Sequence, residues 1–141
     1  MNRIRKELLN YFSISTSTLN RVILTAPYRY KVFHIPKKKP GEFREVAQPA
    51  YEVKALQNWL VGFLQDHLPL HAATVAYRVQ RGIRYNAAQH LKDRFLLKMD
   101  LRHFFPSVKH ADLLRHLEKY CDLDLESADY EDVSRIALWQ R

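Results

Sequence analysis

The sequence predicts an α+β fold in which helices surround a short antiparallel sheet, and three observations support this. Apolar residues recur at helical spacing in several separate stretches, while two short stretches have the alternation and the β-branched, aromatic composition of strands. The order helix, hairpin, helix, strand, helix is typical of an α+β domain. The length of 141 residues and the 47% hydrophobic content suit one domain with its own core.

Two short helices are expected at the N-terminal end. Apolar residues around 8–12 predict the first helix, and residues 19–25 predict the second. Thr18 is placed to cap the second helix, because its hydroxyl can accept a hydrogen bond from a free backbone N–H of the first turn. Pro27 is expected to end this helix, since the residue before a proline disfavours the helical conformation.

Residues 30–47 predict a β-hairpin with a lysine-rich tip. The β-branched and aromatic run over residues 30–35 has strand character, and residues 37–42 contain three lysines, a proline and a glycine, as expected of a charged turn. Pro49 then opens an amphipathic helix that should end near His67.

A less regular stretch, residues 71–85, precedes a short helix expected over 86–92 and a strand expected over 94–100. Alternation with a period of two divides the side chains of this strand between its two faces. Asp100 lies at the end of the predicted strand, where a carboxylate is costly unless something uses it.

Two helices complete the predicted fold. A sharp turn at residues 104–107 precedes a helix that carries apolar residues from 113 to 120. The last helix is expected over 128–139, capped by Ser127, with acidic side chains in its first turn where they complement the helix dipole.

The charge is unevenly distributed. The chain carries 23 Lys and Arg against 15 Asp and Glu, a net charge of +8, and residues 1–46 hold ten of the basic and only three of the acidic side chains. Residues 121–141 hold two basic and six acidic ones. A basic front half is expected of a protein that binds a phosphate-rich partner, although a solvated basic surface explains it equally well.

The cellular compartment is predicted from the lone cysteine and from the N-terminus. Cys121 is the only cysteine, which excludes an internal disulfide and favours a reducing environment. The first ten residues are basic and amphipathic and lack the apolar stretch of a signal peptide, and no apolar run approaches the roughly 20 residues that cross a bilayer. We therefore expect a cytoplasmic protein that does not engage a membrane.

Three motifs, ordered along the chain, resemble the reverse transcriptases of bacteria. Residues 30–38 (Tyr-Lys-Val-Phe-His-Ile-Pro-Lys-Lys) resemble the fingers of this family, and residues 99–108 (Met-Asp-Leu-Arg-His-Phe-Phe-Pro-Ser-Val) resemble its first palm motif. Residues 86–90 (Asn-Ala-Ala-Gln-His) match the element that distinguishes the retron branch. The first match continues through Gly41, Arg44, Pro49 and Lys54-Ala55-Leu56-Gln57. Together the motifs are far more specific than any one of them.

The resemblance implies a right-hand polymerase of which this chain forms the fingers and part of the palm. Residues 1–27 would be an N-terminal helical segment, residues 28–93 the fingers and residues 94–141 the start of the palm.

The resemblance also implies a metal-dependent catalytic centre. Asp100 corresponds to the first carboxylate of a site for two Mg²⁺ ions, with the backbone carbonyl of Leu101 as a further oxygen ligand. From the residues alone, Asp100 could equally be a carboxylate that caps the following turn.

Nucleotide contacts are implied at the hairpin and after Asp100. Arg44, with Lys37 and Lys38, corresponds to the fingers residues that contact the incoming triphosphate, although lysines at a hairpin tip also serve solubility. His103, Phe104 and Phe105 would line the dNTP site, with the ring of Phe105 beneath the sugar, where it excludes a 2′-hydroxyl. The alternative for the two phenylalanines is a core pair.

Nucleic-acid contacts are expected in the stretch before the predicted strand. Arginines interleaved with tyrosines suit phosphate contact and base stacking, and an asparagine and a histidine four residues apart would share one helix face. A solvated loop and a structural histidine are the alternatives. The candidates are Arg78, Arg81, Arg84, Tyr85, Asn86 and His90.

The function implied by the resemblance is RNA-directed DNA polymerase of retron type, a nucleotidyltransferase that uses dNTPs to copy a structured non-coding RNA into DNA. Anti-phage defence with an effector protein as partner is implied at the level of the system. The alternatives are a non-catalytic RNA-binding module and a group II intron-like reverse transcriptase, which residues 86–90 disfavour.

One departure from the family concerns activity. The family brings its remaining metal carboxylates from a Tyr-x-Asp-Asp hairpin, and the nearest string here, residues 130–133 (Tyr-Glu-Asp-Val), lacks the second aspartate and lies in helical sequence. The thumb is missing as well. We therefore expect a fragment truncated before this motif and inactive by itself, because one carboxylate cannot hold a two-metal site.

Overall fold

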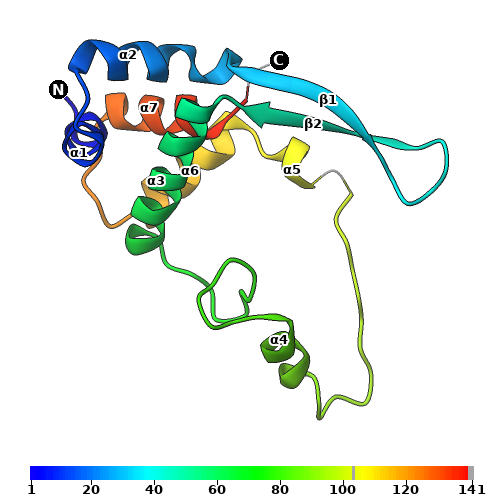
Figure 1. Ribbon diagram of the computed structural model, residues 1–141. Helices are drawn as coiled ribbons and strands as arrows, with labels where there is room; N and C mark the ends of the chain where they lie inside the picture. The colour runs from blue at the N-terminus through cyan, green and yellow to red at the C-terminus, as the bar shows by residue number, and fades with distance from the viewer. Residues whose placement is uncertain (103, 140–141) are drawn as a thin grey trace. The chain divides into compact units, whose positions relative to one another are not determined.

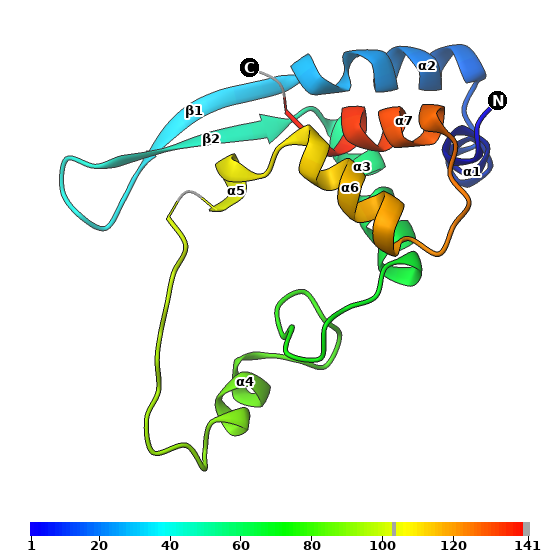
Figure 2. The same ribbon diagram turned by 180° about the vertical axis from the view of Figure 1, so that it is seen from behind.

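The computed structural model describes residues 1–102 and 104–139, and the side chains of Phe105 and Pro106 are outside the description. The chain divides into two compact units, which are treated separately below. The helical unit comprises residues 1–68 and 110–141, and the loop unit comprises residues 69–109. Figures 1 and 2 follow the chain through both units.

The helical unit contains five α-helices, a single 3-10 turn and one two-stranded sheet among its described residues, which confirms the coarse prediction of helices with a short antiparallel sheet. Its elements are α1 (Arg3–Phe12), α2 (Thr16–Thr25), the 3-10 turn Ala26–Tyr28, β1 (Tyr30–Pro36), β2 (Phe43–Pro49), α3 (Tyr51–His67), α6 (His110–Tyr120) and α7 (Ser127–Ala137).

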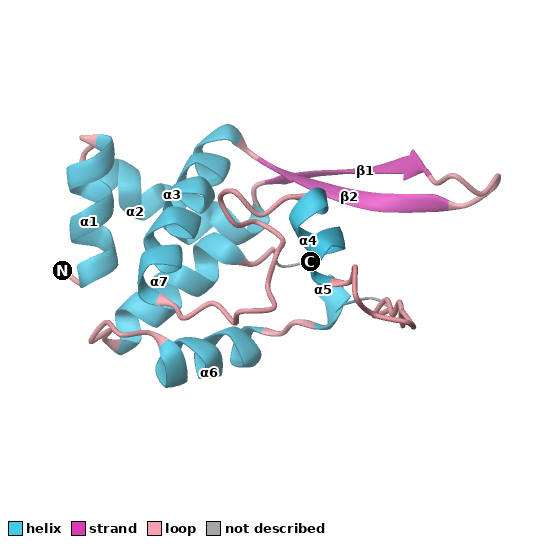
Figure 3. Ribbon diagram, turned by 90° about the horizontal axis from the view of Figure 1, so that it is seen from below, coloured by secondary structure: helices cyan, strands magenta, loops and turns pink. Residues whose placement is uncertain are grey.

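One hydrophobic core joins the five helices. Figures 1 and 2 show α2 running alongside α7, and α7 also contacts α1, α3 and α6. Figure 3 shows the same helices from below. Each helix contributes the apolar side of its amphipathic pattern, as the periodicity predicts. The core consists of Ile4, Leu8, Leu19, Val22, Ile23, Leu56, Leu60, Leu117, Val133 and Ile136.

The hairpin of the helical unit confirms the predicted strands. β1 and β2 pair antiparallel from Tyr30 opposite Pro49 to Pro36 opposite Phe43. Gly41 has a φ of 81° in the turn, a conformation that glycine adopts without steric cost. At the base, the side-chain amide of Gln57 donates to the Tyr30 hydroxyl at 2.8 Å, so the hairpin is anchored on α3. Burial raises the pKa of Tyr30.

Both predicted helix caps are wrong, the first by three residues and the second by one. α2 begins at Thr16, and the Ser15 hydroxyl, rather than that of Thr18, accepts the hydrogen bond, which comes from the N–H of Thr18 at 3.2 Å. α7 is capped by Glu126 and not by Ser127, because Glu126 and Asp129 form a reciprocal capping box.

The acidic residues of α7 do more than complement the helix dipole. Asp129 is fully buried and accepts a hydrogen bond from the backbone N–H of Ile4 at 2.7 Å. Asp132 is also buried and accepts from the Arg5 side chain at 2.7 and 2.8 Å. Through these contacts α7 holds the first turn of α1. The hydrogen bond with Asp132 is the main cause that raises the pKa of Arg5.

The loop unit holds α4 (Ile83–Gln89) and the single helical turn α5 (Phe104–Ser107). α4 begins three residues earlier than predicted and ends before Lys92, because the extended backbone of Gly82 precedes it and His90 is its C-cap. The sharp turn expected at residues 104–107 is this helical turn.

The strand predicted over residues 94–100 is not formed. This segment has no regular structure, and Phe95, Leu97 and Met99 are 90%, 79% and 79% exposed. A strand requires a partner for its backbone hydrogen bonds. In the described part of the chain β1 and β2 pair only with each other, so the segment has none. None of the described helices has both the length and the apolar character needed to span a membrane.

Candidate functional site

The tip of the hairpin carries the predicted phosphate-binding lysines. Lys37 Nζ lies 3.3 Å from one carboxylate oxygen of Glu42, and Lys39 Nζ lies 3.1 Å from the other. These hydrogen bonds, that of Lys39 first, lower the pKa of Glu42. Lys38 is exposed and forms no ion pair with the residues described here. Lys38 is therefore more available for an anion than Lys37.

Arg44 lies in β2 directly opposite Ile35 and is exposed. Paired residues share a sheet face, and so do residues two apart along a strand, which places Arg44 on the face that also carries Lys31 and Phe33. Tyr30, which contacts α3, lies on the opposite face. Arg44 thus lies on the sheet face opposite to that of Tyr30.

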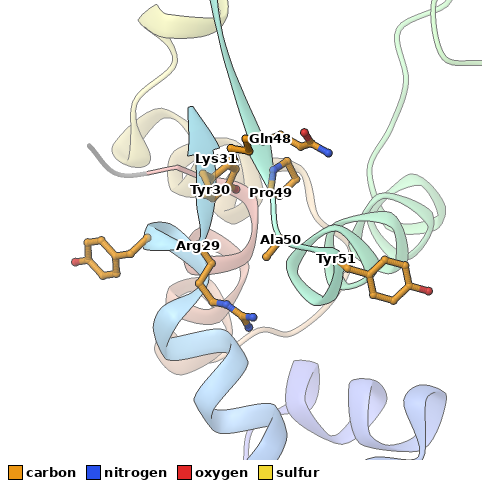
Figure 4. A pocket seen from close by; sticks show the side chains of 8 residues that line it. Arg29, Tyr30, Lys31, Gln48, Pro49, Ala50 and Tyr51 are labelled. Carbon is orange, nitrogen blue, oxygen red and sulfur yellow. The ribbon is translucent and has the colours of Figure 1, made fainter. Parts of the chain in front are cut away.

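A shallow pocket lies at the base of the hairpin, with a volume of about 580 Å³. Figure 4 shows Arg29 and Lys31 at this pocket, with Tyr51 projecting outward at one side. Arg29 is ion-paired with Glu52 at 3.0 Å. The pKa of Glu52 is lowered, first by a hydrogen bond from its own backbone N–H and then by Arg29. The pocket is lined by Tyr28, Arg29, Tyr30, Lys31, Gln48, Pro49, Ala50 and Tyr51.

The two cations of this pocket, Arg29 and Lys31, were not predicted from the sequence. The period-two alternation of β1 could have placed Lys31 on the face of Arg44, but the pairing register needed for that step comes only from the structure. Arg29 had no sequence signal, since its partner Glu52 lies 23 residues away.

Three predicted arginines lie in the loop unit, Arg84 in the first turn of α4 and Arg78 and Arg81 in the loop before it, and they differ in their surroundings. Arg81 is half-buried, and its Nη1 donates to the carbonyl of Ala72 at 3.0 Å. Its guanidinium also lies over the ring of Tyr85, 5.0 Å from the centroid. Arg84 is exposed, and Arg78 is half-buried. Neither of these two side chains forms an ion pair within residues 1–102 and 104–139.

Asn86 lies in the middle of a short helix and His90 at its C-terminal end, and both are exposed. Asn86 is in α4, and His90 is its C-cap. His90 Nδ1 lies 3.0 Å from the carboxylate of Asp93.

The predicted catalytic residues lie in the irregular segment of the loop unit. Asp100 and Leu101 are exposed and lie outside any helix or strand. Phe104 begins α5, and its carbonyl accepts a hydrogen bond from the Ser107 hydroxyl at 2.6 Å. His103 and the side chain of Phe105 lie outside the described residues.

The donors at Asp100 and Leu101 match the chemistry of Mg²⁺ only in part. A carboxylate and a backbone carbonyl are oxygen ligands of the kind that this hard cation takes. The described residues contain no group of three or more His, Cys, Asp and Glu side chains that could hold a metal ion. These two residues therefore fit one side of a metal site and cannot form the whole of it.

The predicted contacts are divided between the two units. Lys37, Lys38 and Arg44 belong to the helical unit, whereas Asp100 and the arginines belong to the loop unit. In the helical unit, the predicted cations lie together on the hairpin. In the loop unit, Arg81 contacts Tyr85 near the start of α4.

Comparison with known proteins gives one matching family and several relatives that belong to it. Residues 35–122 match the family described as "Reverse transcriptase (RNA-dependent DNA polymerase)". The chain is 36% identical over 96 residues to the retron Ec86 reverse transcriptase of Escherichia coli. The aligned residues make up 67% of this chain and 30% of that protein. It is 31% identical over 126 residues to the retron Ec73 reverse transcriptase of Escherichia coli, covering 88% of this chain and 40% of the relative.

A relative from another species supplies a similar match. The retron Mx162 reverse transcriptase of Myxococcus xanthus is 36% identical over 89 residues, which cover 63% of this chain and 18% of that protein. The chain thus spans less than half of the length of each of these relatives.

Proposed function

This chain belongs to the reverse transcriptase family, within its retron type, and from that premise we propose that it contributes the fingers and the first palm carboxylate of an RNA-directed DNA polymerase. The observation that carries the proposal is the family match over residues 35–122, which includes the hairpin cations and Asp100. The proposed substrates are dNTPs, and the proposed template is a structured non-coding RNA.

The hairpin is proposed to hold the triphosphate of the incoming nucleotide. A guanidinium binds phosphate oxygens as a rigid fork, whereas a lysine supplies a mobile point charge. Arg44 is exposed on the hairpin and Lys38 has no ion-pair partner among the described residues, which supports these two as the main contacts. Lys37 would first have to break its ion pair with Glu42 before it could bind a phosphate.

Asp100 and the Leu101 carbonyl are proposed to hold part of a Mg²⁺ site. When bound, Mg²⁺ neutralises phosphate charge during nucleotidyl transfer. Asp100, the second residue of the first palm motif, would supply one negative oxygen ligand. Phe105 is proposed to lie beneath the sugar and to exclude ribonucleotides by steric clash, with His103 and Phe104 beside it.

RNA contact is proposed for the arginine-rich stretch of the loop unit and for α4. The exposed guanidinium of Arg84 suits a phosphate, and the ring of Tyr85 suits a base. Asn86 and His90, both exposed on α4, are proposed to contact folded RNA.

A complete catalytic centre needs further carboxylates, and no Tyr-x-Asp-Asp string occurs within the 141 residues. We therefore expect no dNTP incorporation by this chain alone in a primer-extension assay with Mg²⁺. Robust incorporation would contradict the proposed need for the missing carboxylates.

The experiment that tests the role of Asp100 uses a polymerase in which this chain is joined to a segment carrying Tyr-x-Asp-Asp. Asp100→Asn should abolish incorporation, because the amide has lost the negative charge that binds Mg²⁺, and should leave RNA affinity nearly unchanged. Asp93→Asn, which alters an exposed carboxylate paired with His90, is the control and should retain synthesis. Incorporation by Asp100→Asn at the unmodified rate would refute the metal role.

The second candidate is a non-catalytic RNA-binding module. The observation that favours it is the exposure of Lys38, Arg44 and Arg84 without a metal-binding group of side chains in the described residues. RNA binding that persists while the joined polymerase stays inactive would support this alternative. The group II intron-like reading is disfavoured, since the matched relatives are retron reverse transcriptases. Roles in anti-phage defence, an effector partner and a cytoplasmic location stay predictions.

A further inference from the structure

The loop before α4 is closed by one side chain. Arg81 Nη1 donates to the carbonyl of Ala72 at 3.0 Å, which ties together residues nine positions apart. The entry of the loop is held by the N–H of Thr74, which donates to the His71 carbonyl at 2.9 Å. Residues 72–81 are called the arginine loop below.

Arg81 also ties the arginine loop to α4. The Cζ atom of its guanidinium lies 5.0 Å from the ring centroid of Tyr85, a cation–π contact. Tyr85 is the third residue of α4. One edge of the planar Arg81 guanidinium is thus hydrogen-bonded to a carbonyl, and one of its faces is covered by a ring. Fewer of its N–H groups are therefore available to a phosphate than those of Arg84.

The backbone of the arginine loop adopts two uncommon conformations. Tyr77 and Gln80 have φ values of 58° and 63°, in the left-handed region that bulky residues disfavour. The N–H of Arg81 donates to the carbonyl of Arg78 at 3.3 Å, so Gln80 is the third residue of a turn. Such conformations persist only where the surroundings hold them, and the hydrogen bond from Arg81 to the Ala72 carbonyl spans this loop.

The held conformation presents an exposed tip. Tyr77 and Val79 are 88% and 90% exposed, on either side of Arg78. An exposed ring beside an arginine is the combination with which proteins bind single-stranded nucleic acid.

We propose that Arg81 is a positioning residue that holds the tip formed by Tyr77, Arg78 and Val79 in place for a single strand of RNA. The proposal rests on the proposed function for its ligand, and it removes Arg81 from the set of phosphate contacts. Phosphate contact is left to Arg78 and Arg84. A tip that is ordered before binding does not have to be ordered by the RNA, which raises affinity without adding a charge contact.

The test compares Arg81→Gln and Arg81→Lys with Arg84→Gln as the matched control in the 141-residue chain. Fluorescence anisotropy with a labelled 20-nucleotide oligouridylate measures affinity over a series of KCl concentrations, and hydrogen–deuterium exchange measures protection of residues 72–81. Arg84→Gln should reduce the slope of log affinity against log salt by about 0.7, because one phosphate contact is lost, and should leave exchange unchanged.

Arg81→Gln should instead weaken binding by about three- to tenfold at every salt concentration with an unchanged slope, and should speed exchange in the arginine loop. Arg81→Lys should behave like Arg81→Gln, because an ammonium keeps the charge but not the planar fork. The proposal is overturned if Arg81→Lys binds RNA as the unmodified chain does, or if Arg81→Gln lowers the slope while exchange stays the same.

RNA contact by the loop unit and the positioning role of Arg81 are refuted by different results. If the unmodified chain does not bind the oligouridylate at all, RNA contact by this unit is refuted, and with it the proposed purpose of the tip. If RNA binds and exchange in residues 72–81 is the same in all variants, only the positioning role of Arg81 is refuted.

Discussion

Asp132 is a buried carboxylate, and its charge is compensated by contacts from α1. Arg5 donates to both of its oxygens, at 2.7 and 2.8 Å, and the Asn2 amide donates at 2.7 Å. The two bonds from Arg5 form the parallel fork that makes arginine–carboxylate pairs strong. The same aspartate belongs to the string that comes nearest to Tyr-x-Asp-Asp. Because both oxygens are engaged by Arg5, the structure gives it a role in folding.

Substitution of this carboxylate should destabilise the helical unit. Asp132→Asn removes the charge that faces Arg5 and leaves a polar mismatch in a buried place, so the free energy of unfolding should fall by about 2–3 kcal/mol. Urea denaturation followed by circular dichroism measures the change. Glu131→Gln is the control on the next residue, where an exposed pair with Arg135 should contribute less than about 1 kcal/mol. Equal effects of the two substitutions would contradict the structural role of Asp132.

Among the elements, α1 ends in a way that a single substitution can improve. Ser13 is the C-cap with a φ of 51°, and its N–H donates to the carbonyl of Leu9 at 3.0 Å. This left-handed conformation carries a steric penalty for any residue with a Cβ.

Ser13→Gly should therefore raise the free energy of unfolding by about 0.5–1 kcal/mol, as measured by thermal or urea denaturation. Asn10→Gly, within α1 and exposed, is the matched control and should lower it by a few tenths of a kcal/mol, about the difference in helix propensity. A loss of stability on Ser13→Gly would show that this cap is not left-handed in solution.

The hairpin tip supports a prediction about pH. Lys39 and Lys37 lower the pKa of Glu42 in the folded chain, so the ion pairs are fully present above the ordinary pKa of a glutamate and are lost as the pH falls through the lowered value. A carboxyl-detected NMR titration should give Glu42 a midpoint below that of an unperturbed glutamate.

Lysine substitutions separate the causes of that shift. Lys39→Gln should move the Glu42 midpoint back up, since the hydrogen bond from Lys39 is the largest cause. Lys38→Gln should leave it nearly unchanged, because Lys38 does not contact Glu42 in the described hairpin. An equal shift for both would mean that Lys38 is also engaged by Glu42, and that the tip offers no preferred lysine to a phosphate.

At the scale of the whole molecule, the two units differ in how much of their chain packs in a hydrophobic core. The helical unit has a core to which five helices contribute, whereas the apolar side chains of residues 95–101 are exposed in the loop unit. An apolar segment with unpaired backbone groups offers an edge to which other strands can pair.

Hydrogen exchange should reveal this difference. In the 141-residue chain, amides of residues 95–101 should exchange as fast as those of an unstructured peptide, while amides of α3 from Val53 to Leu64 should be protected. In a polymerase completed with a Tyr-x-Asp-Asp segment, the same amides should become protected as the strand gains partners. Strong protection of residues 95–101 in the chain alone would contradict the absence of a strand.

The local elements of this protein could be predicted from its sequence. Three local patterns predicted them: the apolar spacing of α3, the alternation of β1 and the turn residues around Gly41. Each pattern involves only a few neighbouring residues, so it can be recognised in the sequence. The family motifs are local strings as well, which is why the family could be recognised from the sequence. The caps at Ser15 and Glu126 were missed by a few residues, because several adjacent side chains can compete for one free N–H.

Only the tertiary structure decided which side chains are engaged and which are available. The burial of Asp129 and Asp132 depends on α1, more than a hundred residues away, and the tie of Arg81 to Ala72 depends on the course of a loop. The strand expected before Asp100 depends on partners that residues 1–102 and 104–139 do not provide. Hydrogen bonds and burial of this kind depend on groups that are distant in the chain, so local helix and strand propensities cannot predict them.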